Sequence, residues 1–240
     1  MTEDIFRRNS DLEEFSYIVS HSLRAPVANI LGLANLIEME GITDAEKSYI
    51  VSGVTASVKK LDEVIQDLNH VTQIRHSASA DKQIVTFTTL ANHIIKDHTN
   101  EKDIHITTDF SEIDSFETVG SHMHSIFYNL ITNCLKVKRT GVPLTCAISS
   151  KKNDDSFQLS FKDNGMGMDL KKAGNQVFDL YKKFHKGAGE DRGIGLFMVK
   201  AHVETLGGKI HVHSELNKGT EFTIEFPLHA QDSPQRVPAV

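Results

Sequence analysis

The segment Phe15–Pro26 reads Phe-Ser-Tyr-Ile-Val-Ser-His-Ser-Leu-Arg-Ala-Pro. It places His21 in a helical pattern, with Arg24 three residues and Pro26 five residues further on. A proline in a helix removes a backbone donor and clashes with the preceding turn, so a kink or strained turn is expected beside His21. Because most helical histidines are surface or packed residues, this segment alone assigns no function.

Apolar residues around this segment predict two long helices. Gly41 is a suitable end for the first helix, and Thr43 with Glu46 forms a capping box that begins the second. The apolar positions of the first helix are Leu12, Phe15, Val19, Leu23, Ile30, Leu33 and Ile37. Those of the second are Ile50, Val54, Leu61, Val64, Leu68 and Val71, a narrow seam typical of bundles.

Two such helices joined by a short loop predict an antiparallel hairpin. A lone hairpin cannot bury both seams, so we expect it to dimerise with a second copy into a four-helix bundle. Periodicity equally allows an intramolecular bundle or a docking helix. We assign residues 1–76 to this helical domain and residues 77–83 to a hinge, because the sequence there is small and polar.

Composition excludes several classes of protein. The formal charge of -6 leaves no basic surplus to neutralise phosphates, so no nucleic-acid partner is expected. Two cysteines without paired spacing, Cys134 and Cys146, indicate a reducing compartment and no disulfide framework. The most apolar run, residues 26–37, is too short to span a membrane. We expect a cytoplasmic protein, or the cytoplasmic portion of a longer, membrane-anchored one.

Residues 84–228 have a different pattern, in which short β-rich runs mix with helical stretches without regular βαβ alternation. This predicts an α+β sandwich with one sheet backed by helices. The expected strands are 84–87, 104–110, 144–150, 157–163, 209–215 and 221–228. The expected helices are 90–98, 121–137 and 194–206, and residues 229–240 are expected to be a disordered tail.

Three polar residues share one face of the expected helix 121–137. Asn129, Asn133 and Lys136 are spaced i, i+4 and i+7. Asparagines lower helix propensity, so their position asks for a reason. An amide oxygen is a suitable ligand for Mg²⁺, and an ammonium suits phosphate. A solvent-facing polar stripe explains the same trio equally well.

Two glycine-containing segments follow. The segment 163–167 reads Asp-Asn-Gly-Met-Gly after an expected strand, so the carboxylate can accept a hydrogen bond from an exocyclic amine while glycines allow close backbone approach. The segment 193–196 reads Gly-Ile-Gly-Leu and opens a helix, whose free N–H groups suit a triphosphate. Each segment alone also fits an ordinary loop.

In this order, and with a terminal Gly219-Thr220 hairpin, these motifs resemble the ATP-binding domain of the GHKL superfamily, which has the Bergerat-type α/β-sandwich fold. The segment Ser20–Pro26 resembles the phosphoacceptor box of sensor histidine kinases. Together the two resemblances cover roughly residues 11–228.

The resemblance implies an ATP-dependent protein histidine kinase of two-component signalling. His21 would be autophosphorylated and would pass the phosphoryl group to an aspartate of a response regulator. The implied partners are a second copy of the chain, bound through the N-terminal helices, and a receiver domain, and the implied cofactors are ATP and Mg²⁺. An upstream sensor module is expected to be absent from this chain.

The resemblance also implies roles for individual residues. The catalytic residues would be His21, Asn129 and Lys136, and the metal ligand would be Asn133. The nucleotide-binding residues would be Asn129, Asn133, Lys136, Asp163, Gly165, Gly167, Tyr181, Lys183, Gly193, Gly195 and Leu196. Phe178, Tyr181 and Lys183 would form the aromatic box of a mobile lid over the ATP.

Four positions depart from the family pattern. Ser22 stands where the commonest box has an acidic residue, and Ala25 where it has Thr or Asn. Val137 replaces an aromatic residue, and Asp191 replaces a glycine of the lid. Ser22 and Asp191 keep open an alternative, a phosphotransfer or scaffold protein with a degenerate ATP-binding domain. An ATPase of the gyrase or chaperone branch would leave the phosphoacceptor box unexplained.

Overall fold

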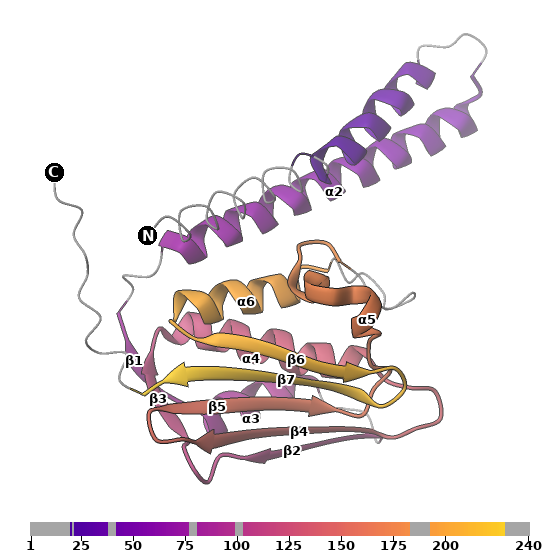
Figure 1. Cartoon of the computed structure of the whole chain (residues 1–240). Coiled ribbons are helices and arrows are strands. Elements are labelled where there is room, and N and C mark those ends of the chain that lie inside the picture. The colour runs from indigo at the N-terminus through magenta and orange to yellow at the C-terminus, as the bar shows by residue number, and fades with distance from the viewer. Residues whose placement is uncertain are drawn as a thin grey trace, which may run out of the picture. The chain divides into compact units, whose positions relative to one another are not determined.

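The computed structural model describes residues 20, 22–37, 42–76, 81–98, 103–182 and 193–228. The chain divides into two compact units, Met1–Gln73 and Ile74–Val240 (Figure 1). The predictions made for His21, Gly41, Lys183, Asp191 and the tail 229–240 lie outside the described residues.

The first unit contains two helices. Residues 22–37 are helical through Pro26, which is buried, and α2 (Asp44–His76) follows. The expected capping box begins α2: the Thr43 hydroxyl accepts a hydrogen bond from the Glu46 N–H at 3.3 Å. In return, the Glu46 carboxylate accepts hydrogen bonds from the Thr43 N–H at 2.8 Å and from its hydroxyl at 2.7 Å. These bonds lower the pKa of Glu46 and satisfy amides that the helix leaves unpaired.

The predicted seam of α2 is confirmed where burial is described. Ile50 and Val64 are buried, and Val54 and Leu61 are half-buried. A Cβ atom added to Gly53 would lie 2.9 Å from Leu33 Cδ1, so the first helix packs closely against α2 at this glycine. The seam therefore joins the two helices of one chain, and it is a different surface from the apolar residues left exposed.

The second unit is the predicted sheet backed by helices. Its sheet has the order β2-β4-β5-β7-β6, with β2 parallel to β4 and the other neighbours antiparallel, and β1 and β3 form a separate antiparallel pair. The first elements are β1 (Gln83–Thr86), α3 (Phe87–His98), β2 (Ile104–Asp109), β3 (Ser115–Thr118), α4 (Gly120–Lys136) and β4 (Leu144–Lys152). The others are β5 (Ser156–Asp163), α5 (Leu170–Ala173), η2 (Gly174–Phe178), α6 (Gly195–Thr205), β6 (Lys209–Glu215) and β7 (Gly219–Pro227).

The sequence-based assignment was wrong around α3 and β3. Phe87 begins α3 instead of ending a strand, and β3 was not predicted. The reason is a helix cap supplied from a distant segment: the Asp114 carboxylate accepts hydrogen bonds from the N–H and the hydroxyl of Thr88, both at 2.8 Å. A cap contributed from 26 residues away leaves no local signal.

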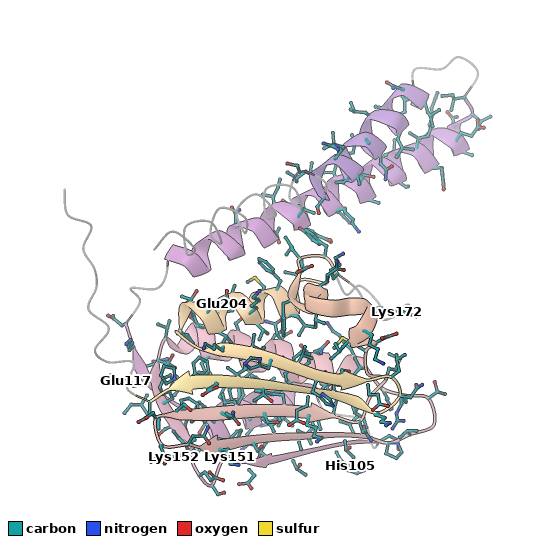
Figure 2. The ribbon with its side chains drawn as sticks, viewed as in Figure 1. His105, Glu117, Lys151, Lys152, Lys172 and Glu204 are labelled. Carbon is teal, nitrogen blue, oxygen red and sulfur yellow. The ribbon has the colours of Figure 1, made fainter. Side chains whose placement is uncertain are left out.

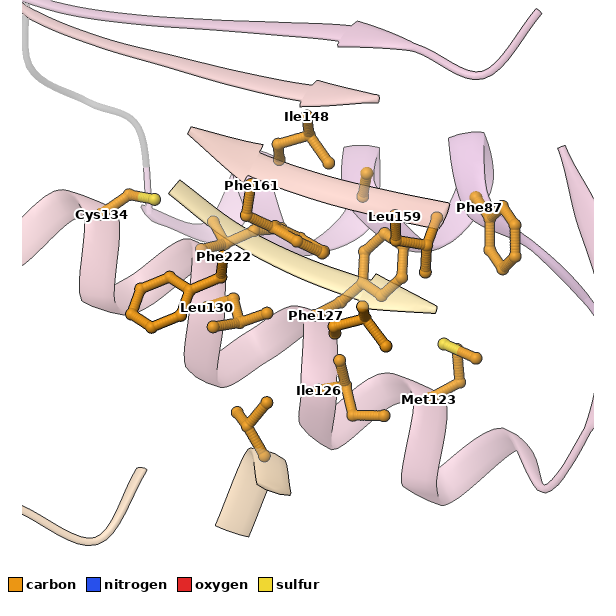
Figure 3. Close-up of a cluster of buried hydrophobic side chains, with 14 of the residues drawn as sticks. Phe87, Met123, Ile126, Phe127, Leu130, Cys134, Ile148, Leu159, Phe161 and Phe222 are labelled. Carbon is orange, nitrogen blue, oxygen red and sulfur yellow. The ribbon is translucent and has the colours of Figure 1, made fainter. Parts of the chain in front are cut away.

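The core lies between one face of the sheet and the helices (Figures 1 and 3). Burial alternates along β5 and β7, as expected for strands that are covered on one face. The inward residues of these two strands are Phe157, Leu159, Phe161, Phe222, Ile224 and Phe226. They meet α4 through Met123, Ile126, Phe127, Leu130 and Cys134, all fully buried. The core therefore holds α4 firmly on the sheet and fixes the direction of its polar face.

Candidate nucleotide site

A hydrogen bond within α4 orients the side chain of Asn129, one of the three polar residues expected on one face of this helix. The Asn129 amide nitrogen donates to the Ser125 carbonyl at 2.8 Å, which leaves its Oδ1 as an available acceptor. That oxygen faces the start of α6, since a Cβ atom on Gly195 would lie 3.0 Å from it. Asn133 is half-buried and Lys136 is exposed on the same helix. The fold thus brings Asn129 beside the Gly-Ile-Gly-Leu segment, as expected if the two belong to one site.

The N-terminus of α6 is free to bind an anion. Its N-cap residue, Ile194, makes no side-chain capping hydrogen bond. The Met198 N–H donates to the Ile194 carbonyl at 2.9 Å, so the amides that precede Met198 in the first turn have no helical partner. Unpaired amides and the helix dipole together favour a phosphate here. Leu196 packs its side chain against the core, so only its backbone is suited to such a contact.

A backbone hydrogen bond joins Tyr181 to Gly193, which stand on either side of residues 183–192 in the sequence. The Tyr181 N–H donates to the Gly193 carbonyl at 2.9 Å. Gly193 has a φ of 71°, and a Cβ atom there would collide with the Lys182 carbonyl. Only glycine satisfies both constraints without strain, which explains its position at the end of the expected lid. Phe178, expected in the same aromatic box, packs instead against Phe222 of the core.

Asp163 is the buried carboxylate of the site. Its Oδ1 accepts hydrogen bonds from the Gly165 N–H at 2.7 Å and the Thr220 N–H at 3.3 Å. Its Oδ2 is also buried, and has no hydrogen-bond partner among the residues that the structure describes. Burial raises the pKa of Asp163, and the two amide bonds oppose this rise. A buried oxygen without a donor costs free energy, so the geometry suits a ligand that brings an N–H group.

Glycines line the backbone around Asp163. A Cβ atom on Gly165 would collide with the Val137 carbonyl, and one on Gly219 would collide with the Asp163 carbonyl. Gly167 has a φ of 61° and lies against the Glu215 carbonyl. The backbone segments around this carboxylate therefore approach one another more closely than any residue with a Cβ atom would allow.

The end of α4 lies next to this carboxylate. Cys134 and Cys146 are both buried free thiols, and a hydrogen bond between them, together with burial, raises the pKa of Cys134. The charge of Asp163 raises this pKa further, and Cys146 is the cross-strand partner of Asp163. Cys134 lies in the core of the domain. Its contact with Cys146 was missed, because their spacing in sequence carries no signal.

Other contacts also had no sequence signal. The Ser214 hydroxyl accepts from the Met168 N–H at 2.7 Å and lies 2.9 Å from the Thr220 hydroxyl. Arg139 donates to the Asn217 carbonyl at 2.5 Å. Both contacts join loops around Asp163 that lie far apart in the chain.

The family comparisons agree with this geometry. Residues 11–77 match the family model of the His Kinase A (phospho-acceptor) domain. Residues 118–230 match the model of the histidine kinase-, DNA gyrase B-, and HSP90-like ATPases. The chain belongs to the sensor histidine kinases, as a transmitter region in which a phosphoacceptor domain precedes an ATPase-type domain.

Two sequence relatives extend this finding. The chain is 29% identical over 221 residues to the heme sensor protein HssS of Staphylococcus saprophyticus, covering 89% of this chain and 46% of that protein. It is 23% identical to cyanobacterial phytochrome A of a Nostoc species, covering 98% of this chain and 31% of that protein. The chain therefore spans less than half the length of these two relatives.

Solved histidine kinases share the fold. The kinase AdeS of Acinetobacter baumannii matches with a TM-score of 0.58 at 16% identity, over 87% of this chain and 98% of that one. ThkA, solved in complex with the response regulator TrrA, matches with a TM-score of 0.60 at 17% identity, over 92% of this chain and 63% of that one. ShkA, solved with AMPPNP, matches with a TM-score of 0.57 at 22% identity, over 89% of this chain and 45% of that one.

Proposed function

We propose that this chain is the catalytic part of an ATP-dependent protein histidine kinase, which phosphorylates itself on His21 and then a response-regulator aspartate. The observation that carries the proposal is the Asp163 carboxylate, buried with Oδ2 free, in a glycine-lined site beside the end of α4. The same helix holds Asn129 against the N-terminus of α6. An adenine amine supplies the N–H that Oδ2 lacks, and a triphosphate matches the α6 amides.

The polar face of α4 would serve the phosphate end of the nucleotide. Asn129 Oδ1 is held toward Gly195, and we assign Asn133 as the Mg²⁺ ligand and Lys136 as a phosphate contact. Among the described residues, no group of three or more His, Cys, Asp or Glu side chains is arranged to hold a metal ion. Mg²⁺ would therefore take most of its ligands from phosphate oxygens and water, as it commonly does.

The transfer itself requires little covalent chemistry from the protein. A neutral imidazole at His21 would form a P–N bond to the γ-phosphorus as the P–O bond to ADP breaks, and its ring proton would pass to water. Ser22 is a poor base, so the rate would depend mainly on positioning. The solved relatives ShkA with AMPPNP and ThkA with TrrA support a nucleotide and a response regulator as the partners.

We further propose the domain boundaries 1–76, 77–83 and 84–228, with 77–83 as the hinge that lets His21 reach the nucleotide. Homodimerisation through the N-terminal helices is supported by apolar side chains that the described part of the hairpin leaves exposed, such as Leu31 and Val51. No helix in the described part of the chain is long and apolar enough to cross a membrane. A cytoplasmic location is part of the proposal.

The decisive experiment is labelling with [γ-³²P]ATP and Mg²⁺. We expect incorporation that is labile to acid and stable to base, as a phosphohistidine is. His21→Gln should abolish the label, whereas the matched control His105→Gln, at an exposed position on β2, should retain it.

The alternative, a phosphotransfer or scaffold protein with a degenerate ATP-binding domain, predicts a different result. Nucleotide would bind, or fail to bind, without any acid-labile label on His21 in the wild-type chain. That outcome would overturn the kinase proposal, and label transferred from an already phosphorylated receiver domain would then favour a phosphotransfer protein.

A further inference from the structure

Arg139 links two loops at the nucleotide site. It lies between α4 and β4, and its Nη1 donates to the carbonyl of Asn217 at the tip of the β6–β7 hairpin, 2.5 Å away. The Arg139 side chain is half-buried, and its Nε is out of contact with solvent, with no hydrogen-bond partner in the part of the chain that the structure describes. The bond from Nη1 to the Asn217 carbonyl is charge-assisted, and such bonds are stronger than those between neutral groups, so it restrains the guanidinium at this place.

The same two loops are joined through Met166. The Met166 N–H donates to the Val137 carbonyl at 2.8 Å, and the Met166 carbonyl accepts from the Asn217 N–H at 2.7 Å. Arg139 completes this arrangement, because it donates to the carbonyl of the same residue, Asn217, whose N–H bonds Met166. Three segments are thereby connected in a ring: the end of α4, the glycine loop at Met166 and the hairpin tip at Asn217.

Two of these segments carry the donors that hold Asp163. Gly165, the neighbour of Met166, donates to Asp163 Oδ1 at 2.7 Å. Thr220, three residues beyond Asn217, donates to the same oxygen at 3.3 Å. The β5–β7 pairing reaches only Lys162 and Glu221, so it does not include these donors. Thr220 is paired with Ser214 in the β6–β7 hairpin, so its position relative to Gly165 depends on the contacts that join this hairpin to the glycine loop. These contacts are the Met168–Ser214 bond and the Met166–Asn217 bond, the second of which Arg139 supports.

We propose that Arg139 is a positioning residue of the nucleotide site. It holds the hairpin tip against the glycine loop, which keeps both amides on Asp163 Oδ1 and leaves Oδ2 available to the adenine amine. The inference rests on the proposed function, because it assumes that Asp163 binds adenine. It goes beyond that function by assigning a role to a residue outside the proposed set of nucleotide-binding residues.

The test uses the full chain and a matched set of variants. Arg139→Met keeps the aliphatic stem and removes the donor, whereas Arg139→Lys restores one cationic donor. Lys151→Met, at the opposite end of β4 from the α4–β4 loop, makes the same change of charge at an exposed position (Figure 2). For each variant, ADP affinity is measured by calorimetry, and KM and kcat for ATP are measured by autophosphorylation.

We expect Arg139→Met to weaken ADP binding about tenfold, the equivalent of about 1.4 kcal/mol. The KM for ATP should rise by a similar factor, while kcat at saturating ATP stays within about twofold. Arg139→Lys should recover most of the affinity, and Lys151→Met should match the wild type. Amide hydrogen exchange should quicken at Gly165, Asn217 and Thr220 in Arg139→Met, and stay slow at Ile224 in the centre of β7.

Wild-type ADP affinity in Arg139→Met would overturn the inference. Equal losses of ADP affinity in Arg139→Met and Arg139→Lys would also overturn it. So would faster amide hydrogen exchange that includes Ile224, since either result indicates a general loss of stability. If the wild-type chain binds no adenine nucleotide, the proposed function fails instead. The exchange rates at Asn217 and Thr220 would then still show whether Arg139 holds the hairpin tip.

Discussion

Asp163 combines a cost in stability with the binding role proposed for it. Burial raises its pKa more than the amide bonds from Gly165 and Thr220 lower it. A raised folded-state pKa means that the native state holds the proton more tightly than the unfolded chain. Its stabilising contribution is present at acid pH and is lost as the pH rises through the raised pKa. Above the raised pKa the ionised carboxylate therefore costs stability, as is common for groups selected for binding.

Asp163→Asn should separate the two effects. We expect adenine nucleotide affinity to fall at least about tenfold, because the amide presents an N–H to the amine of the base. The melting temperature at pH 7 should rise above that of the wild type, and the difference should shrink as the pH falls below the raised pKa of Asp163. Calorimetric titration and thermal melts at two pH values would measure both.

The matched control is Asp154→Asn, which removes a carboxylate from the exposed β4–β5 turn. It should leave both nucleotide affinity and melting temperature unchanged. A variant Asp163→Asn that binds nucleotide normally would remove this residue from the site, and one that melts lower at pH 7 would contradict the assigned electrostatic cost.

At the scale of elements, α4 and α6 meet through two histidines. The rings of His122 and His202 have centroids 4.7 Å apart, and both side chains are buried. Burial lowers the pKa of His122. Burial, and then the charge of His122, lowers the pKa of His202 to about 4. Both imidazoles are therefore neutral in the native state at pH 7, and protonation of either would put a charge between the two helices.

This pair should make the ATPase-type domain sensitive to acid. Because the folded pKa of His202 is depressed, its contribution to stability is present above the unfolded value of 6.5 and is lost as the pH falls toward 4. The loss from His202 alone has a ceiling of about 3 kcal/mol. Urea unfolding followed at several pH values between 7 and about 4 would measure it.

His202→Gln should flatten this pH dependence, since glutamine does not titrate in the range. His211→Gln, at an exposed position on β6, should leave the wild-type slope unchanged. Equal slopes in the wild type and in His202→Gln would contradict the assignment of the acid sensitivity to this pair.

At the scale of the whole molecule, the hairpin leaves a second apolar surface uncovered. Val51, Val58 and Ile65 repeat at heptad spacing along α2 and are 55%, 48% and 45% exposed. They lie about 100° around the helix from the seam that begins at Ile50, as adjacent residues do. A stripe of this kind is typical of a helix that packs against a further helix, and it supports the proposed dimer.

Charging the stripe should prevent dimerisation. We expect the wild-type chain to behave as a dimer in light scattering after size-exclusion chromatography, and the double variant Val51→Glu, Val58→Glu to behave as a monomer. The substitutions cost little within one chain because both side chains are already exposed, so ADP affinity should not change. Lys59→Glu, which adds an acid on the same helix at an exposed polar position, should remain dimeric. A dimer that survives the double substitution would show that this stripe is not the interface.

Much of the fold was predictable because it depends on local rules. The capping box at Thr43, the seam of α2 and the strand 209–215 follow from turn chemistry and from the period of apolar residues. The start of α3 and the strand β3 were not, since the Asp114 cap comes from a distant loop. The motifs likewise include Asp163, Gly165 and Gly195 of the proposed site, but no motif includes Arg139 or His202.

The sequence by itself determined which chemical groups the chain carries and in what order. Helical period, capping and the positions of glycines depend only on residues that are close together along the chain. That order was sufficient to recognise a histidine kinase transmitter region. Only the tertiary structure decided that one oxygen of Asp163 is held by Gly165 and Thr220 while the other is free. It also decided that Arg139 reaches Asn217, 78 residues away. These contacts depend on sheet register and helix packing, which bring together residues whose separation along the chain has no characteristic pattern.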